Sequence, residues 1–380
     1  MRSRGKSIVL ARLHAYIYQM GYLEDLQVLV ECESPSHDLD ACNRVVDVSV
    51  DIANRILKEP AKKVMEMGQP IFWWGSTTPQ ILLVAHLDTV WSFSSFQPKW
   101  SVEGDIARGP GIFDMKAGFI QALYALKDIP DAHNRVALLG TTDEEIESLK
   151  SRQLIQSLAR TARYALILEP SFEGNVKTRR KGAGMYTLTV HGLAAHAGLD
   201  PEKGVNASVE IAALVPKIVA LSNPINGTTV TPTVIRSGVT TNTIPDLATL
   251  EIDCRSFSSD ELVEIDAKIR SFKPENPLAS IVVNGAINRP PLEVGASEVL
   301  FEKLSSMTKR LGLEEIGQSA VGGVSDGNLT AAEGTMTLDG LGAVGGGAHA
   351  KSEHVMISQI PKRIQILHEL LKDLLQEDWE

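Results

Sequence analysis

Acidic and histidine side chains follow apolar runs at several points of this 380-residue chain. Three runs are short, β-branched and almost uncharged, which indicates buried strands, and they lead into Asp, Glu or His: ILLVAHLDTV (81–90), RVALLGTTDEE (135–145) and YALILEPS (164–171). Two glycine-containing segments, GPGIFDMKAG (109–118) and GAVGGGAHAKSEH (342–354), carry further candidates. Unpaired charge inside a buried strand is costly, so we expect these side chains at the carboxyl ends of the strands, facing a crevice.

Charges of one sign do not gather in a crevice without compensation. Several anionic side chains that converge there would repel one another, and a cation held between them removes the repulsion. The acidic residues come from more than one segment and are accompanied by histidines. The sequence therefore predicts a metal site with more than one ion.

The elements that would position these side chains alternate between strand and helix. The hydrophobic pattern predicts strands at 81–85, 135–141 and 164–168, with helices at 116–127 and 149–160 between them. This order is typical of an α/β fold with a mostly parallel sheet covered by helices.

A different pattern begins after residue 177. The segment MYTLTVH alternates apolar and polar residues, as in a strand with one exposed face. The order of elements that follows is βαββαβ, the split-βαβ or ferredoxin-like arrangement. The predicted elements are a strand at 185–191, a helix at about 203–221, strands at 228–237 and 247–255, a helix at 260–272 and a strand at 280–285.

The first pattern returns at about residue 291, with a helix at 296–311 and another near the C-terminus. The last histidine candidate, His349, lies in this returning part. We therefore predict a discontinuous catalytic metal-binding domain of residues 1–176 and 291–380. Residues 177–290 would form a smaller domain inserted into it.

Composition and charge limit the classes of partner. The chain is 43% hydrophobic and 22% charged, with a net charge of −10, which argues against binding to nucleic acid or to an anionic membrane surface. No uncharged run reaches the roughly 18–20 residues of a membrane span. Arg12 and His14 interrupt the short apolar stretch near the N-terminus, so no signal peptide is expected. Three cysteines without a CxxC pattern fit a reduced, cytoplasmic location.

Five motifs carry a resemblance to a known family. HLDTV, GPGIFDMKAG, DEE, LEP and the GAH near the C-terminus occur in the order found in M20 metallopeptidases. This group includes glutamate carboxypeptidases, acetylornithine deacetylase and succinyl-diaminopimelate desuccinylase. The resemblance covers nearly the whole chain. It implies a zinc-exopeptidase-like αβα catalytic domain with an inserted ferredoxin-like α+β domain that serves as a dimerisation and lid domain.

The resemblance also implies a role for each metal-facing residue. His86 and Glu169 would bind a first ion, and Asp114 would bridge both ions. Glu145 and His349 would complete the ligands of a second ion. Ligation by nitrogen and carboxylate oxygen suits zinc, with cobalt or manganese as substitutes.

Two further carboxylates would support the chemistry. By resemblance, Asp88 orients the imidazole of His86 and so raises its basicity. Glu144 is the general acid/base: it takes a proton from a metal-activated water and passes it to the leaving nitrogen. His354, five residues after His349, is the alternative histidine ligand, although a packing role is expected for it.

Three residues of the inserted domain are expected to meet the substrate. By resemblance, His196 stabilises the oxyanion, and Asn242 and Arg255 hold a free carboxylate. An arginine offers a bidentate fork for a carboxylate, and an asparagine can donate from its amide. The alternative for Arg255 is a plain surface ion pair, because alternation places it on the polar face with Glu251 and Asp253.

Two backbone features are expected near the centre. The resemblance implies a cis peptide bond between Asp114 and Met115. Glu147 stands where many relatives have glycine, which would be costly if that position needs a positive φ.

The function that we expect is a cytoplasmic, dinuclear-metal amidohydrolase that cleaves an amide beside a free α-carboxylate, as a glutamate-carboxypeptidase-like exopeptidase. It would form a homodimer through the inserted domain, with His196 acting on the partner's site. The alternative is an N-acyl-amino-acid deacylase, which shares the same catalytic residues. A silent binding protein is disfavoured because Glu144 is intact, and a dinuclear phosphoesterase because no phosphate-binding glycine loop is evident.

Overall fold

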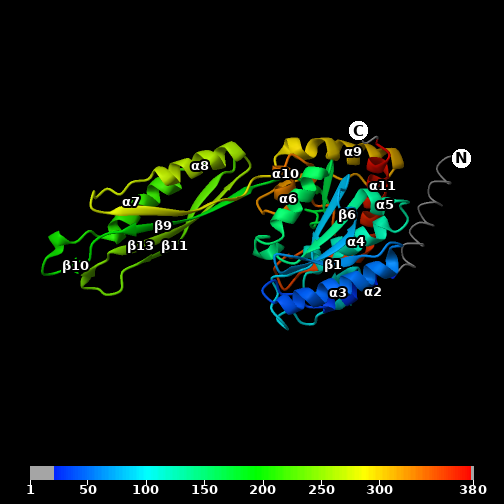
Figure 1. Cartoon of the computed structure of the whole chain (residues 1–380), viewed down its shortest axis with the longest axis horizontal. Helices are drawn as coiled ribbons and strands as arrows, with labels where there is room; N and C mark the ends of the chain where they lie inside the picture. The colour runs from blue at the N-terminus through cyan, green and yellow to red at the C-terminus, as the bar shows by residue number, and fades with distance from the viewer. Residues whose placement is uncertain (1–20, 378–380) are drawn as a thin grey trace. The chain divides into compact units, whose positions relative to one another are not determined.

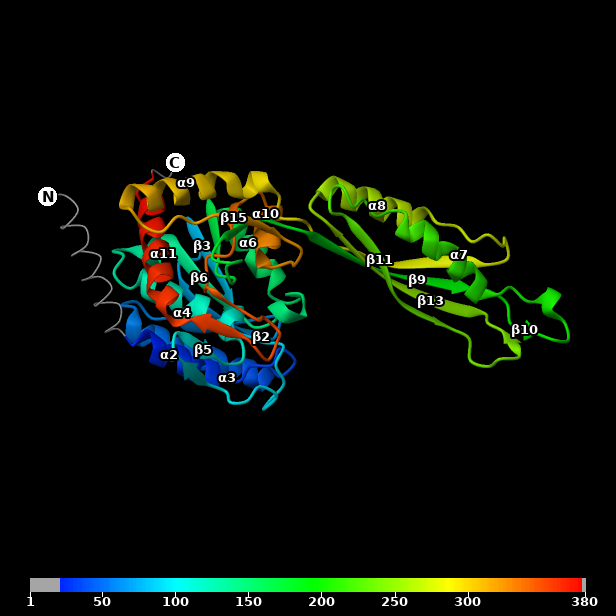
Figure 2. The same ribbon diagram turned by 180° about the vertical axis from the view of Figure 1, so that it is seen from behind.

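A computed structural model describes residues 21–377 of the chain, which divide into two compact units. The first unit contains the described residues up to Thr178, Val294–Ala320 and the residues from Ser325 onward; the second contains Arg179–Glu293 and Val321–Val324 (Figures 1 and 2). The N-terminal stretch, to which the expectation of no signal peptide applied, lies outside the described residues. Among residues 21–377, no helix is long and apolar enough to cross a membrane.

The first unit is built on a six-stranded sheet with the order β1-β2-β6-β3-β7-β16. The central strand β3 runs parallel to both β6 and β7, whereas the hairpin of β1 and β2, which the hydrophobic pattern did not predict, joins the sheet antiparallel to β6. Every residue of β3, β6 and β7 is buried. The strands are β1 Lys62–Glu66, β2 Gln69–Gly75, β3 Ile81–His86, β6 Val136–Thr141, β7 Tyr164–Ile167 and β16 Met336–Leu338.

Helices cover both faces of this sheet, which explains the continuous burial of its parallel strands. Alternate residues of β3 belong to different cores: Leu83 packs with the larger helix layer, whereas Leu82 packs with α6 and α10. The larger layer contains α2 Tyr22–Glu31, α3 Leu39–Ile56, α4 Ala117–Leu126, α9 Val294–Leu311 and α11 Ile360–Leu375. The opposite layer contains α6 Arg152–Thr161 and α10 Asp326–Ala332. The predicted αβα architecture is confirmed.

A small sheet beside the main one joins two distant segments of the first unit. Its order is β17-β18-β5-β4, and β18 pairs antiparallel with β5 so that His354 faces Arg108. The loop between β17 and β18 therefore lies next to the residues that follow β5. The strands are β4 Ser101–Glu103, β5 Ile106–Arg108, β17 Gly345–Gly346 and β18 His354–Met356.

The second unit has the predicted βαββαβ order and an antiparallel sheet with the ferredoxin-like order β11-β13-β9-β14. Two helices pack on one face, where the inward residues Ala248, Leu250, Ile252 and Cys254 of β13 are buried. The alternation of buried and partly exposed residues along β13 is the pattern from which this strand was predicted. The elements are β9 Gly182–His191, α7 Ala207–Val219, β11 Thr229–Ser237, β13 Leu247–Ser256, α8 Ser259–Ser271 and β14 Ser280–Arg289.

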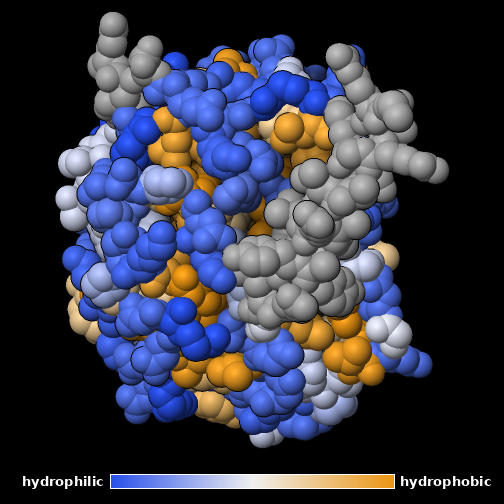
Figure 3. Space-filling model, turned by 90° about the vertical axis from the view of Figure 1, so that its right-hand side faces the viewer, coloured by the Kyte–Doolittle hydropathy of each residue, from blue (hydrophilic) through white to orange (hydrophobic). Residues whose placement is uncertain are grey.

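One face of the first unit is mostly hydrophilic (Figure 3), as expected from the chain's ordinary composition. Figure 3 shows one face of the first unit, on which hydrophilic side chains dominate and apolar side chains gather in small groups between them. Among the coloured residues of this face, no large continuous hydrophobic patch is visible.

Candidate metal centre

Side chains from five segments of the first unit converge at the carboxyl ends of the parallel strands. His86 ends β3, and the register of the sheet places it opposite Thr141, the last residue of β6. Glu169 follows the end of β7 by two residues. The other contributions come from η1 (Ile112–Lys116), from the short turn η2 (Glu144–Ile146) after β6, and from the loop between β17 and β18.

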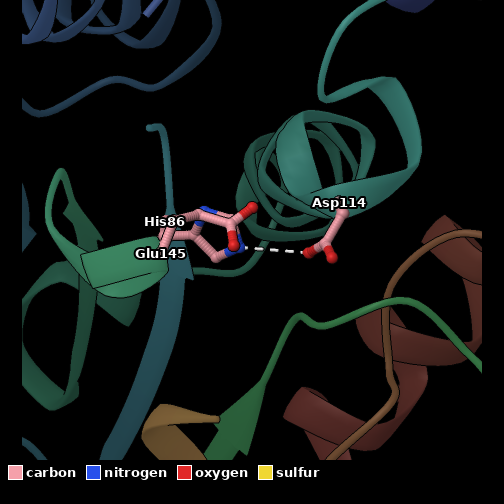
Figure 4. Close-up of side chains that lie close together, drawn as sticks. All are labelled: His86, Asp114 and Glu145. Atoms are coloured by element: carbon pink, nitrogen blue, oxygen red, sulfur yellow. Dashed lines mark hydrogen bonds and ion pairs between the residues drawn. The ribbon is translucent and has the colours of Figure 1, made fainter. Parts of the chain in front are cut away.

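Asp114 lies between the two histidines of this cluster. Its Oδ1 is 3.1 Å from His86 Nε2, and its Oδ2 is 3.5 Å from His349 Nε2. His349 Nε2 also lies 3.1 Å from Glu145 Oε1, and His86 Nε2 lies 3.9 Å from Glu169 Oε1. Figure 4 shows His86, Asp114 and Glu145 directed toward one another, with a dashed line from the imidazole of His86 to Asp114. All five predicted ligands therefore belong to one cluster.

The distances among ligand atoms are compatible with metal ions. One ligand atom each from His86, Asp114 and Glu145 lie within 4.8 Å of one another, and the same holds for His86, Glu144 and Glu169. Both adjacent glutamates thus reach the centre. The mixture of imidazole nitrogen and carboxylate oxygen is the donor set that zinc prefers. By the chemistry of their donors, the residues present fit the predicted divalent ions.

The electrostatic environment of the cluster favours positive charge. Burial lowers the pKa of His86, but hydrogen bonds to Asp114 and Asp88 outweigh burial and hold that pKa well above its usual value. Hydrogen bonds to Asp114 and Glu145 raise the pKa of His349 to about 10. Burial raises the pKa of Asp114, but its bonds to both histidines hold it below its usual range. The carboxylates therefore attract a cation to this point.

Asp88 is fully buried and contacts three residues of the centre, His86, Glu144 and Glu145. Its Oδ1 accepts a hydrogen bond from the backbone N–H of Glu144 (3.3 Å), and its Oδ2 accepts one from that of Glu145 (3.2 Å). The Nδ1 of His86 lies 3.1 Å from the backbone carbonyl oxygen of Asp88 and 3.5 Å from its Oδ1. An Nδ1–H that donates here leaves Nε2 as the ligand atom. Asp88 thus orients the histidine, to which its backbone carbonyl lies closer than its carboxylate, and holds the backbone of both glutamates.

Both backbone expectations are met. The peptide bond between Asp114 and Met115 is cis, as predicted. Glu147 has φ 75° and ψ 15°, so it occupies the left-handed region that favours glycine. His349 also has a positive φ, of 60°.

His196 and Asn242 are neighbours at one end of the second unit. His196 belongs to β10 (Ala195–His196), which pairs with β12 (Thr243–Ile244), and the backbone N–H of Ala197 donates to the Asn242 carbonyl (2.9 Å). Both predicted residues are exposed. The backbone N–H groups of Gly198 and Leu199 donate to His196 Nδ1, each at 3.1 Å. In the neutral ring this leaves the proton on Nε2, from which His196 can donate a hydrogen bond.

Arg255 lies toward the other end of the same sheet. On β13, Leu247 pairs with His191 and Arg255 pairs with Ala183. A rise of about 3.3 Å per residue separates these two positions of β13 by about 26 Å. Arg255 donates from Nε and Nη2 to the carboxylate of Asp253, with its nearest oxygens at 3.0 Å. Within one chain, the sheet therefore does not bring Arg255 together with the pair at the β10–β12 end.

Sequence reasoning missed one buried carboxylate, Glu353, which lies close to the predicted ligands. It is 0% exposed and accepts hydrogen bonds from the backbone around Asp114. Its neighbours in the sequence, Lys351 and Ser352 before it and His354 after it, are polar, so no apolar pattern signalled its burial. His354 itself hydrogen-bonds through Nδ1 to the carbonyl of Ser352.

Comparisons with known proteins agree with the fold. A sequence model of peptidase family M20/M25/M40 matches residues 82–373. Carboxypeptidase G2 of Pseudomonas sp. (strain RS-16) is 33% identical over 315 residues, which cover 77% of this chain and 74% of that protein. A succinyl-diaminopimelate desuccinylase of Aliarcobacter butzleri is 23% identical over 331 residues, covering 79% and 85%.

A solved structure with the same fold is that of the aminopeptidase PepT from Bacillus cereus. It superposes with a TM-score of 0.74 at 19% identity, covering 94% of this chain and 99% of that one. At this identity the likeness concerns the fold alone.

Proposed function

The chain belongs to peptidase family M20/M25/M40 and is a hydrolase of C–N bonds, and from this premise we propose that it is a dinuclear-metal carboxypeptidase-like amidohydrolase. Its substrate would be an amide next to a free α-carboxylate, as for a glutamate carboxypeptidase. The observation that carries this proposal is the position of Asp114, whose two oxygens lie 3.1 Å and 3.5 Å from different histidines. A carboxylate so placed is suited to bridge two ions.

We propose for the two ions the ligand sets that the family resemblance implies, and the contacts of Asp114 and His349 support them. His86 and Glu169 would bind the first ion, Glu145 and His349 the second, and Asp114 both. When bound, divalent ions, for which we propose zinc, supply Lewis acidity that polarises an amide carbonyl and lowers the pKa of a water.

We assign the proton transfer to Glu144. It stands beside the proposed ligand Glu145, and the Asp88 carboxylate accepts hydrogen bonds from both of their backbone N–H groups, which fixes the backbone of this turn. Glu144 would take the proton of the attacking water and deliver it to the leaving nitrogen. His196, with its proton on Nε2, would donate to the carbonyl oxygen as negative charge develops there.

A homodimer would complete the site. The sheet of the second unit ends in the edge strands β11 and β14, and an exposed edge is suited to pairing with a second copy. We propose that His196 serves the partner's centre, and that Asn242 and Arg255 hold the substrate carboxylate from two different chains. The separation of about 26 Å along β13 supports this division, because one second unit cannot bring both ends to one carboxylate. The cytoplasmic location stays a prediction.

An N-acyl-amino-acid deacylase is the second candidate, because the relatives include desuccinylases as well as a carboxypeptidase. The zinc-loaded protein should be assayed against peptidyl-glutamates and, in parallel, against N-acetyl and N-succinyl amino acids. A higher kcat/KM for peptidyl-glutamates would support the carboxypeptidase. A higher value for the N-acyl amino acids would favour the deacylase, and no hydrolysis of either set would contradict both.

A further inference from the structure

Glu353 is a buried carboxylate that is surrounded by hydrogen-bond donors. Its Oε1 accepts from the backbone N–H groups of Phe113 (3.0 Å) and Asp114 (3.1 Å). Its Oε2 accepts from the backbone N–H of Gly111 (3.1 Å) and from Trp91 Nε1 (2.8 Å). Each oxygen therefore receives two N–H groups, and an ionised carboxylate, which only accepts, is the side chain that satisfies all of them.

The contacts of Glu353 connect two loops that each carry a predicted metal ligand. The His349 loop, residues 347–353, contains Glu353 itself, and its turns are closed by hydrogen bonds from the N–H of Ala350 to the Gly347 carbonyl and from the N–H of Glu353 to the Ala350 carbonyl, each 2.8 Å. The Asp114 loop, residues 109–116, contains the three backbone donors. The pairing of β18 with β5 brings the two loops side by side.

We propose that Glu353 is a positioning residue that fixes Asp114 relative to His349 and so preorganises the site of the second ion. This inference rests on the proposed two-metal function. Two of the three proposed ligands of the second ion, Asp114 and His349, lie on these two loops, whereas Glu145 lies in η2. Of the first ion's ligands only the shared Asp114 lies on them, because His86 and Glu169 lie at strand ends. Loss of the Glu353 carboxylate should therefore weaken binding of the second ion more than binding of the first.

The substitution Glu353→Gln tests this role with little change in shape. It replaces one oxygen with an NH₂ group, which then faces two N–H donors instead of accepting from them. Loss of a group that orients a metal ligand typically weakens metal binding by about 10–100-fold. We expect the second ion to bind about 10–100-fold more weakly in this variant, with a smaller loss of affinity for the first ion, for which Asp114 is the one ligand on the linked loops.

Glu33→Gln is the matched control. Glu33 is also a buried glutamate of the first unit, at 9% exposure, but its Oε1 accepts from the backbone N–H of Ser94 (2.7 Å) and its carboxylate pairs with Lys99, neither of which is a predicted ligand. Trp91→Phe removes one of the four donors and keeps an aromatic ring beneath Lys351. Trp91→Phe should reduce the affinity for the second ion by less than Glu353→Gln does.

In the experiment, each metal-free protein is titrated with Zn²⁺ in a calorimeter. The metal content of each protein is measured separately, after loading with Zn²⁺ and dialysis. A wild-type protein that binds fewer than two ions would overturn the proposed function. A wild-type protein that binds two, with Glu353→Gln binding both unchanged or losing both equally, would overturn the role of Glu353 alone. If Glu353→Gln does not fold, Trp91→Phe decides: selective weakening of the second ion supports the role, and unchanged binding overturns it.

Discussion

The candidate functional residues of the two units differ in how far they are buried and in what contacts them. In the first unit, His86 is 1% exposed and Asp88 0%, and strand ends and buried carboxylates fix their positions. In the second unit, His196 and Asn242 are exposed in and beside the small two-stranded sheet of β10 and β12, and Arg255 is paired with Asp253 on β13. The comparison teaches that the centre of the first unit is organised within the chain, whereas the second unit presents side chains whose proposed partners lie elsewhere.

The largest expected effect tests the first unit. Exhaustive chelation should reduce amide hydrolysis to background, because the water and the carbonyl would lose their Lewis acid. Addition of zinc or cobalt should restore the rate. Hydrolysis that persists after metal analysis shows no bound ion would contradict the metal mechanism.

Glu144→Gln should separate binding from chemistry within the same centre. We expect two bound ions and a kcat reduced by about 10²–10⁴-fold, the usual effect of losing a general base. The adjacent Glu145→Gln is the matched control, and it should lose one ion. Metal analysis that finds the opposite pattern would mean that the two roles are exchanged.

Arg255→Ala probes the second unit. If Arg255 binds the substrate carboxylate, KM should rise by about 10–100-fold, in line with about 1.5–3 kcal/mol for hydrogen bonds to charged groups. A substrate whose carboxylate is amidated should be nearly insensitive to the change. Asp253→Asn, which leaves the guanidinium in place, should not raise KM. Equal effects on both substrates would assign Arg255 to the surface ion pair with Asp253 only.

Mixed dimers test whether His196 in the second unit of one chain completes the metal centre in the first unit of the other chain. Neither Glu144→Ala nor His196→Ala chains should be active alone. If His196 serves the partner, random mixing makes about half of the dimers mixed, each with one intact site, so roughly a quarter of wild-type activity should return. Subunit exchange that is verified by mass and restores no activity would show that His196 acts within its own chain.

The smallest effect concerns the backbone beside the centre. Glu147→Gly should increase the free energy of unfolding by about 1 kcal/mol, because a left-handed φ is unfavourable for glutamate and not for glycine. Glu173, with φ 52°, lies in another turn of the first unit and provides the control substitution Glu173→Gly. Chemical denaturation should show a higher free energy of unfolding for both Glu147→Gly and Glu173→Gly. A loss for Glu147→Gly alone would mean that its side chain stabilises the fold.

Much of the second unit could be predicted because half-exposed strands and amphipathic helices carry their periodicity locally. The strand predicted at 247–255 is observed as Leu247–Ser256, and the helix predicted at 260–272 as Ser259–Ser271. In the first unit, β2 was missed because its apolar run, IFWW, is only four residues long and follows a proline, although six of its seven residues are buried.

The family, the two kinds of sheet and the set of side chains that meet at the strand ends could all be predicted from the sequence, because they depend on local patterns and on motifs that each lie within a few residues. Contacts between distant segments show that Asp88 holds the backbone of both glutamates, that Glu353 connects the loops of Asp114 and His349, and that Arg255 lies far along β13 from the end near which Asn242 lies. These relations depend on strand register and on backbone N–H groups more than 50 residues away along the chain. A residue's own neighbours in the sequence do not specify them.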